Sequence, residues 1–495
     1  MTDTLKAKTA KGLMWGAINN GTMQVLNLAF GIVLARQLSP RDYGIVGVLA
    51  IFTTIASNLQ NAGFSSALIN LKQATARDYN AVFWFSVTVS VVLYALLFLS
   101  APLIAWFFHE PELVKLSRFV FLAFVAGSLA TAHAGYMSRH LMVREVAITG
   151  FIALGLSGTI GVILACTGYG YWALACQNVV FMLLGSVCRY IFIWRQWHPT
   201  FHFDPAPLRS MFGFGSKMLI TNIVNNVSNN VLTVIFGNLY PMKAVGQYTQ
   251  AMKWNNTANG TIGGMVNAVA QPVLASVTDE PGRERRVFRK MMRFTAFLSF
   301  PAMFGLALVS NEFILITIGE KWAESAILLQ ILCISGAFIP LHTLFQNLAI
   351  GNGRSDVYMW CTIAQIAIQI GIILAFHSYG IRTMVTVYAA FLIVWLAVWQ
   401  AIARRLAGIR LNDTLLDTLP FLLAAAATMA VTYIATAWMT NIYLLLAARI
   451  VIAAAVYFVI MKAANAKILN ECLAFLLRRG KYTRITPTQK SSSIS

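Results

Sequence analysis

Charge is scarce in this sequence. Charged residues make up 11% of its 495 positions, whereas soluble proteins carry about 25%. Apolar residues make up 58%, and the mean hydropathy is +0.69. Because a surface with so little charge suits lipid better than water, the composition excludes a set of soluble domains. It predicts membrane spans of roughly 20 residues each.

Other chemistry-bearing patterns are also missing. The six cysteines are scattered without metal-ligand spacing, and the seven histidines are not paired, so we predict no metal site and no cofactor. We also expect no carboxylate in the middle of a span. The net charge of +20 comes from basic residues that lie mostly in loops between apolar runs. That distribution indicates membrane orientation rather than nucleic-acid binding.

Long apolar runs, broken by charged or Pro/Gly turns, are what the sequence has in abundance. The predicted spans are 12–35, 43–62, 80–107, 117–137, 146–167, 170–193, 211–236, 246–272, 293–317, 323–349, 358–377, 383–403, 416–437 and 442–461. The first run shows no signal-peptide cleavage pattern, so we expect it to be retained. Tight turns are predicted at 166–169, 378–381 and 440–441. The predicted fold is therefore an all-α polytopic membrane protein with about 14 transmembrane helices.

The distribution of basic residues orients these spans. If the N-terminus is cytoplasmic, 27 Lys and Arg residues fall in cytoplasmic segments and 7 on the opposite side. This asymmetry fits the positive-inside rule with both termini in the cytoplasm.

A short motif occurs twice. Leu38–Gly44 and Leu239–Gly246 each place a Leu-x-Pro turn and a glycine after a polar span, at an offset of about 201 residues. Six spans separate the two copies, so they predict two lobes related by an axis along the membrane normal; chance recurrence is the alternative. The predicted domains are a six-helix lobe at 1–208, a second at 209–410, two further helices at 411–465, and an amphipathic, disordered tail at 466–495.

Polar side chains follow one face of the first, second, seventh and eighth spans. Polar groups inside a membrane are costly, so whole stripes of them favour a water-filled cavity, with interhelical packing as the alternative. The residues that we predict to line a substrate cavity are Asn20, Gln24, Asn27, Asn58, Asn61, Lys217, Asn225, Asn229, Gln250, Lys253, Trp254 and Asn256.

Three cations within spans help to characterise the ligand. Lys253 lies roughly 13 Å below the outer end of its helix, too deep to reach water easily. Lys217 lies nearer the inner end and could reach water by snorkelling instead, and Arg449 could meet a lipid head group. Cations and amides without carboxylates suit an anionic, sugar-bearing ligand.

Several segments together resemble one known family. They are Gly12–Gly16, Ala35–Gly44, Asn61–Ile69, Gly246–Tyr248, Gly319–Trp322 with Leu328–Leu332, and Gly353–Asp356. The chain resembles the polysaccharide transporter (Wzx-type flippase) branch of the multidrug/oligosaccharidyl-lipid/polysaccharide (MOP) exporter superfamily, and most closely the colanic-acid and exopolysaccharide exporters.

The resemblance implies a V-shaped bundle of two six-helix lobes plus two extra helices, with the first, second, seventh and eighth spans around a central cavity. It also implies that the protein flips an undecaprenyl-diphosphate-linked oligosaccharide from the inner to the outer leaflet of the bacterial inner membrane by alternating access. The product would be exopolysaccharide, capsule or lipopolysaccharide. Implied partners are that lipid-linked substrate, membrane lipids, and the polymerase or export machinery, but no nucleic acid. No catalytic residue or cofactor is implied.

Three other functions stay open. A peptidoglycan lipid-precursor flippase and a multidrug exporter belong to the same superfamily. A membrane glycan polymerase or ligase is the alternative from another class, but such an enzyme needs a sizeable outer loop. The longest outer connection, near 108–116, has about nine residues, so we expect a protein that is not an enzyme.

Overall fold

The computed structural model describes residues 2–61, 64–71, 73–201, 204, 206–276 and 281–471, and every regular element in them is a helix. The chain forms two compact units. Unit 1 comprises Met1–Met252, Thr317–Leu328 and Met359–Met384, and unit 2 comprises Lys253–Ile316, Leu329–Tyr358 and Val385–Ser495. The lobe boundaries predicted at 208 and 410 stay a prediction.

Most helices of unit 1 come from the first half of the chain. They are α1 (Thr2–Gln37), α2 (Pro40–Gly47), α3 (Ala50–Asn61), α4 (Phe64–Asn70), α5 (Ala76–Phe107), α6 (Leu113–Val120), α7 (Leu122–Ser128), α8 (Thr131–Arg139), α9 (Val143–Cys166), α10 (Tyr171–Ile193) and α11 (Ala206–Leu239). The short 3-10 helices η1 (Glu320–Trp322) and η2 (His377–Tyr379) also belong to unit 1.

The remaining helices lie in unit 2 or run from one unit into the other. Those in unit 2 are α13 (Pro281–Thr317, its last residue in unit 1), α15 (Ile339–Gly351), α18 (Leu411–Thr436) and α19 (Ile442–Ala463). Those shared by the units are α12 (Met242–Ala275), α14 (Ala323–Gly336), α16 (Ser355–Phe376) and α17 (Ile381–Ala407).

The helices fit the predicted spans closely. Within the described residues, eleven helical segments are long and apolar enough to cross a membrane. The three other predicted spans coincide with α1, α11 and α12, which are long helices that carry polar stripes in the sequence. The all-helical membrane fold is thus confirmed, while the count of fourteen spans stays a prediction.

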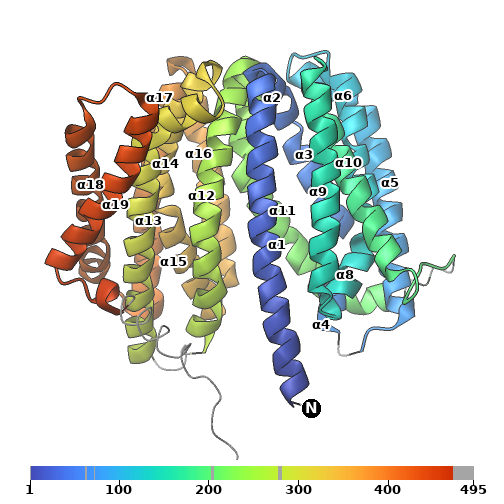
Figure 1. Cartoon of the computed structure of the whole chain (residues 1–495). Coiled ribbons are helices and arrows are strands. Elements are labelled where there is room, and N and C mark those ends of the chain that lie inside the picture. Colours follow the sequence, from blue (N-terminus) through green and yellow to red (C-terminus); the bar gives the residue numbers. More distant parts are fainter. Residues whose placement is uncertain are drawn as a thin grey trace, which may run out of the picture. The chain divides into compact units, whose positions relative to one another are not determined.

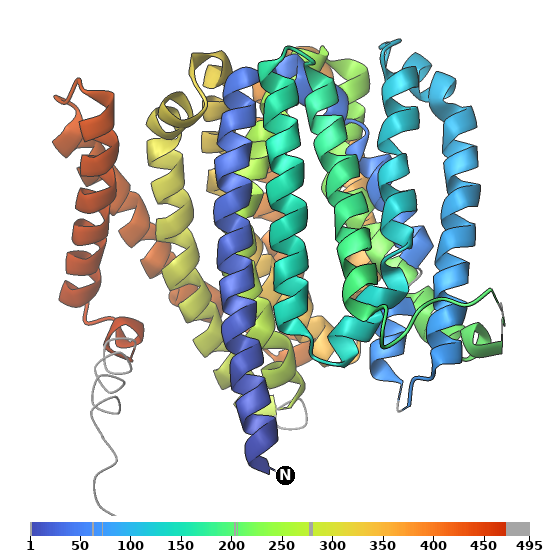
Figure 2. The ribbon, with the colours of Figure 1, turned by 45° about the vertical axis from the view of Figure 1, so that its right-hand side comes forward.

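Close helix packing organises unit 1. The helices α1, α9 and α10 lie side by side (Figure 1 and Figure 2). A Cβ atom on Gly158 of α9 would collide with the ring of Phe30 on α1, so only glycine allows this approach. Elsewhere in unit 1, Phe64, Leu68 and Val82 belong to a buried core that joins α4, α5 and α8.

The three predicted tight turns are confirmed. Gly168 and Gly170, both with positive φ, connect α9 to α10, and Gly380 with a φ of +86° precedes α17. Asn441 caps α19 because its side-chain oxygen accepts hydrogen bonds from the backbone N–H groups of Tyr443 and Leu444.

The two copies of the repeated motif contact each other within unit 1. A Cβ atom on Gly44 would collide with the carbonyl oxygen of Met242, and a Cβ atom on Gly246 would collide with that of Pro40. Both glycines, and both residues whose carbonyls they approach, are related by an offset of 202 positions. The contact is therefore reciprocal, as expected for two copies related by a local two-fold axis.

The Gly319–Trp322 segment holds this junction in place. The Trp322 indole donates a 2.8 Å hydrogen bond to the carbonyl of Ala35, and its ring packs edge-on against Tyr43. The Lys321 ammonium donates to the carbonyl of Arg36 at 2.6 Å. This segment, one of those that carry the family resemblance, is structural: it anchors the end of α1.

Candidate functional site

One face of α1 carries exposed carboxamides. Asn20, Gln24 and Asn27 are all exposed, and their spacing of four and three residues puts them on the same side of the helix. Gly21, which follows Asn20, has no atom within 4 Å of the position that a Cβ would occupy. The predicted polar face of α1 is therefore open rather than buried in helix contacts.

The amides of the second span differ in burial and in hydrogen bonding. Asn58 is partly buried and Asn61 is exposed at the end of α3. Gln60 is buried, and its amide nitrogen donates a 2.8 Å hydrogen bond to the hydroxyl of Thr131. Packing between helices therefore explains Gln60, whereas Asn58 and Asn61 stay candidates for the cavity.

Three predicted residues lie on α11. Lys217, Asn225 and Asn229 fall within the helix Ala206–Leu239, as expected, but their side chains lie outside the described part of the structure. Their role in a cavity stays a prediction.

The helix α12 has a buried face and an open face. Gln250 and Trp254 lie on the buried face, where Trp254 packs edge-on against Phe313 at 4.8 Å between ring centroids. Lys253 and Asn256 lie on the exposed face.

The exposed face of α12 continues through Gly260, Gly264 and Asn267. Nothing lies within 4 Å of the Cβ positions of the two glycines, so the face is open there, whereas farther along the amide oxygen of Asn267 accepts a 2.8 Å hydrogen bond from Asn347 of α15. The Lys253 side chain forms no ion pair or hydrogen bond with any described residue. Lys253, Asn256, Gly260 and Gly264 thus share one exposed face of α12.

Gln250 is a special case among the predicted residues. It is fully buried, and within the described residues neither its amide oxygen nor its amide nitrogen has a hydrogen-bond partner. The indole nitrogen of Trp254 is likewise buried and without a partner there. Leaving buried polar groups unsatisfied costs about 1–3 kcal/mol each.

A cleft of about 330 Å³ lies within unit 1. Its polar lining comprises the carboxamides of Asn27, Gln177 and Asn178 and the hydroxyls of Tyr43, Ser157 and Thr249. The three carboxamides form no hydrogen bonds with the described residues, so their donors and acceptors are free to bind a polar ligand.

Of the residues that line this cleft, the sequence predicted only Asn27. Gln177 and Asn178 are adjacent amides on α10, within a span otherwise poor in polar groups. They do not form a polar stripe, because they are neighbours in sequence and no further amides recur along the same helix face. Two adjacent amides in an apolar run were the signal that could have found them.

One expectation about charge is wrong. Glu312 is buried within the span Gly282–Thr317, where it pairs with Arg449 of α19 at 2.7 Å. Arg449 also donates to the carbonyl of Leu308 at 3.1 Å, and its guanidinium lies over the ring of Tyr433. The carboxylate is tolerated because the cation neutralises it, and the arginine is engaged by protein rather than by a lipid head group.

These features define a polytopic membrane protein with the fold of known flippases and exporters. The lipid II flippase MurJ, in an inward closed conformation, matches with a TM-score of 0.74 over 92% of this chain and 100% of that chain, at 13% identity. A multidrug resistance MATE family transporter of the MOP superfamily matches with a TM-score of 0.60 over 83% and 95%, at 15% identity.

The chain belongs to the polysaccharide biosynthesis protein family, whose model matches residues 33–327. It is 25% identical to the teichuronic acid biosynthesis protein TuaB of Bacillus subtilis (strain 168), over 77% of this chain and 80% of that protein. It is 26% identical to the lipopolysaccharide biosynthesis protein WzxC of Escherichia coli (strain K12), over 72% of each. It is 25% identical to the succinoglycan biosynthesis transport protein ExoT of Rhizobium meliloti (strain 1021), over 85% and 83%. The resemblance found in the sequence is confirmed.

Proposed function

We propose that this protein flips an undecaprenyl-diphosphate-linked oligosaccharide from the inner to the outer leaflet of the bacterial inner membrane by alternating access. The cargo serves the synthesis of exopolysaccharide, capsule or lipopolysaccharide. Names of the relatives support this proposal, since they concern teichuronic acid, lipopolysaccharide and succinoglycan. The main structural support for the proposed function is the exposed face of α12, where Lys253 has no carboxylate partner among the described residues.

The chemistry of this face suits such a cargo. The ammonium of Lys253 attracts an anionic diphosphate, while the carboxamide of Asn256 can donate to and accept from sugar hydroxyls. On α1, the exposed carboxamides of Asn20 and Gln24 offer the same chemistry to sugar hydroxyls. A negative-inside potential favours outward movement of an anion by about 2.3 kcal/mol per charge per 100 mV. The obstacle is the barrier, because a bare charge in hydrocarbon costs far more. Lys253, together with Lys217, lowers this barrier by attracting the diphosphate.

The cleft of unit 1 supplies a second group of amides. Asn27, Gln177 and Asn178 are free of hydrogen bonds to the described residues, as a binding site for several hydroxyl groups requires. The buried amide of Gln250, which has no partner in the described part of the chain, supports movement of α12 during transport. Its desolvation cost is relieved if another conformation exposes it to water or cargo.

Orientation and partners complete the proposal. Both termini lie in the cytoplasm, according to the distribution of basic residues. The protein performs no catalysis and hands its cargo to the polymerase or export machinery. The six-helix lobes at 1–208 and 209–410 enclose the route, with the first, second, seventh and eighth spans lining it. We assign no metal or cofactor to the route.

Substitution of Lys253 tests the transport step. A strain that lacks the gene receives the wild-type protein, Lys253→Gln, or the control Lys243→Gln, which removes an exposed cation from the first turn of the same helix. Surface polysaccharide and the lipid-linked precursor are measured at equal protein levels. We expect Lys253→Gln to lower export at least tenfold while the precursor accumulates, and the control to change export less than twofold. Normal export by Lys253→Gln would refute the assigned role.

The fold similarity to a lipid II flippase favours one alternative cargo, a peptidoglycan lipid precursor. Expression in a strain depleted of its essential lipid II flippase separates the two cargoes. Growth rescue there, without restored polysaccharide in the deletion strain, would favour the peptidoglycan precursor.

A further inference from the structure

The first turns of α13 present basic residues on two faces. Arg285 and Arg289, one turn apart, face α18, while Arg286, Lys290 and Arg293 follow a neighbouring face at spacings of four and three residues. We call the second set the basic stripe. Arg286 and Lys290 are exposed, and Arg293 is partly buried.

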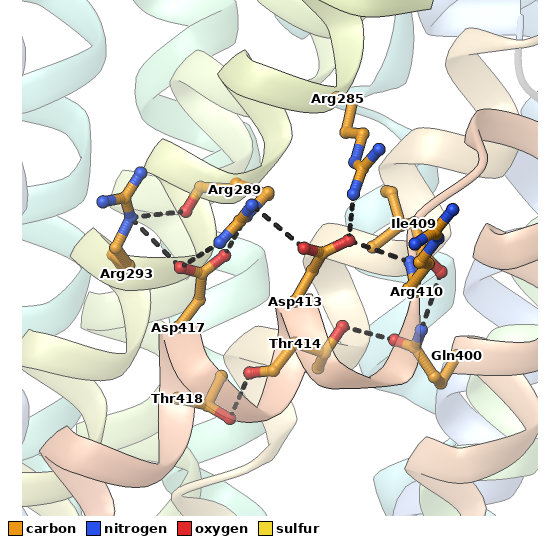
Figure 3. A network of polar contacts seen from close by, with 10 residues as sticks. All are labelled: Arg285, Arg289, Arg293, Gln400, Ile409, Arg410, Asp413, Thr414, Asp417 and Thr418. Carbon is orange, nitrogen blue, oxygen red and sulfur yellow. Dashed lines mark hydrogen bonds and ion pairs between the residues drawn. The ribbon is translucent and has the colours of Figure 1, made fainter.

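The face toward α18 forms an ion network in which Arg289 bridges two aspartates (Figure 3). Its Nε lies 2.6 Å from a carboxylate oxygen of Asp417, and its Nη1 lies 3.0 Å from one of Asp413. Arg285 also pairs with Asp413. Arg293 makes the longest of these contacts, with its Nε 3.4 Å from Asp417. Three arginines thus share two carboxylates, and the network keeps an excess positive charge.

The basic stripe is poorly neutralised. Within the described residues Arg286 forms no ion pair or hydrogen bond, and Arg293 uses only its Nε, so that its Nη groups remain available. Lys290 pairs with Glu471 at 2.6 Å, but both side chains are more than half exposed, and exposed pairs of this kind contribute little. The stripe therefore has free donors for an anion.

The stripe ends where the apolar part of α13 begins. No charged residue occurs between Arg293 and Glu312, which leaves a run long enough to cross most of the hydrocarbon core. Phe294, directly after Arg293, is 41% exposed. The guanidinium of Arg293 is thus placed at the boundary between hydrocarbon and head groups, the level at which lipid phosphates lie.

The same face offers nothing to a sugar. Beyond Arg293 it continues as Phe297, Pro301 and Phe304, which have no side-chain hydrogen-bonding groups, and Phe297 packs against Phe421 of α18 and Tyr457 of α19. A ligand seated here would combine a phosphate with acyl chains and would need no glycan contacts. This favours a membrane phospholipid over the glycan-bearing cargo.

We propose that Arg286, Lys290 and Arg293 bind the phosphate of an anionic phospholipid in the leaflet next to the first turns of α13. The phosphate supplies the negative charge that Asp413 and Asp417 leave uncompensated, and guanidinium groups hold phosphate through charge-assisted, bidentate hydrogen bonds. The acyl chains lie against Phe294, the exposed apolar side chain next to Arg293.

Lipid binding to the purified full-length protein tests this site without any glycan. Phosphatidylglycerol and phosphatidylcholine are titrated into detergent-solubilised protein, and bound lipid is counted by native mass spectrometry. The stripe variant is Arg286→Gln/Lys290→Gln/Arg293→Gln. The matched control is Arg195→Gln/Arg209→Gln/Arg404→Gln, which removes the same charge from other predicted cytoplasmic segments.

We expect the stripe variant to bind phosphatidylglycerol at least tenfold more weakly and the control to lose less than twofold, with phosphatidylcholine unchanged. Equal losses in both variants would mean that binding follows net charge alone and would overturn the site, as would full retention by the stripe variant. Displacement of phosphatidylglycerol by an equal concentration of inorganic pyrophosphate would also overturn it, because the site would then recognise a diphosphate.

A single substitution separates loss of lipid binding from misfolding. Arg286→Gln removes a side chain without ion pairs or hydrogen bonds to the described residues, so thermal unfolding should be unchanged. We expect it alone to weaken phosphatidylglycerol binding about threefold, and unchanged binding would count against the proposal. None of these results depends on polysaccharide export, so failure here and failure of the proposed transport are distinguishable.

Discussion

Lys253 of α12 and Arg449 of α19 are both cations within predicted membrane spans, and both lie in unit 2, but their surroundings are opposite. Arg449 is 7% exposed, and its guanidinium bonds to Glu312 at 2.7 Å, to the carbonyl of Leu308 and to the hydroxyl of Thr436. Lys253 is exposed on a face lined by amides and glycines and has no bonded partner among the described residues.

The difference separates two uses of charge inside a membrane. A charge whose bonds are all made within the protein joins helices, here α13 and α19, and losing its partner leaves a buried ion uncompensated. A charge without internal partners does little for the fold and stays available to a ligand. The same distinction applies to neutral amides, as Gln60 and Gln177 illustrate.

Breaking the paired charge should have the largest effect. We expect Glu312→Gln to destabilise the protein by about 3–5 kcal/mol, because Arg449 then remains buried without a counter-charge. Thermal and denaturant unfolding in detergent micelles measures the change. Glu320→Gln, at an exposed carboxylate, is the control.

A second substitution at Arg449 sharpens this result. The double variant Glu312→Met/Arg449→Leu removes both charges and should recover most of the lost stability, since an apolar pair of similar size avoids desolvation. If Glu312→Gln alone is as stable as the wild type, the pair does not hold α13 and α19 together.

The two glutamines extend the comparison to neutral groups. Gln60→Leu leaves the buried hydroxyl of Thr131 without its partner and should cost about 1–3 kcal/mol. Gln177→Leu should change stability by less than about 0.5 kcal/mol but reduce polysaccharide export. Unfolding and export are measured for both. A stability loss at Gln177 as large as that at Gln60 would remove the distinction.

The smallest effect on stability is expected at Lys253. Lys253→Gln should shift the free energy of unfolding by about 0.5 kcal/mol or less, because no described residue loses a bond. The same unfolding assay provides the value, and export from the same preparation series supplies the functional readout. Marked destabilisation together with normal export would make Lys253 a structural residue like Arg449.

Much of the fold could be read from the sequence because helix formation and membrane crossing depend on local pattern. The turns at Gly168, Gly380 and Asn441 fall where small and polar residues interrupt apolar runs. The recurrence of Leu-x-Pro and glycine indicated two related junctions, and the reciprocal contact of Gly44 with Gly246 agrees with it.

The candidate site was predictable only in part. The exposed amides of α1 and the open face of α12 follow from helical periodicity, but periodicity alone did not separate Lys253 from Trp254, which is buried one position along. Gln177 and Asn178 escaped prediction because their relation to Asn27 depends on the packing of α10 near α1 and α2.

The sequence by itself determined that the chain is a bundle of membrane helices, which of them are polar, and which sides are basic, because hydropathy and charge act over one span at a time. Only the tertiary structure decided which polar groups have partners. Glu312 and Arg449 are 137 residues apart, and Gln60 and Thr131 are 71 apart, so no local pattern relates them. Lys253 is distinguished by the lack of such a contact among the described residues, a property that appears only once the chain has folded.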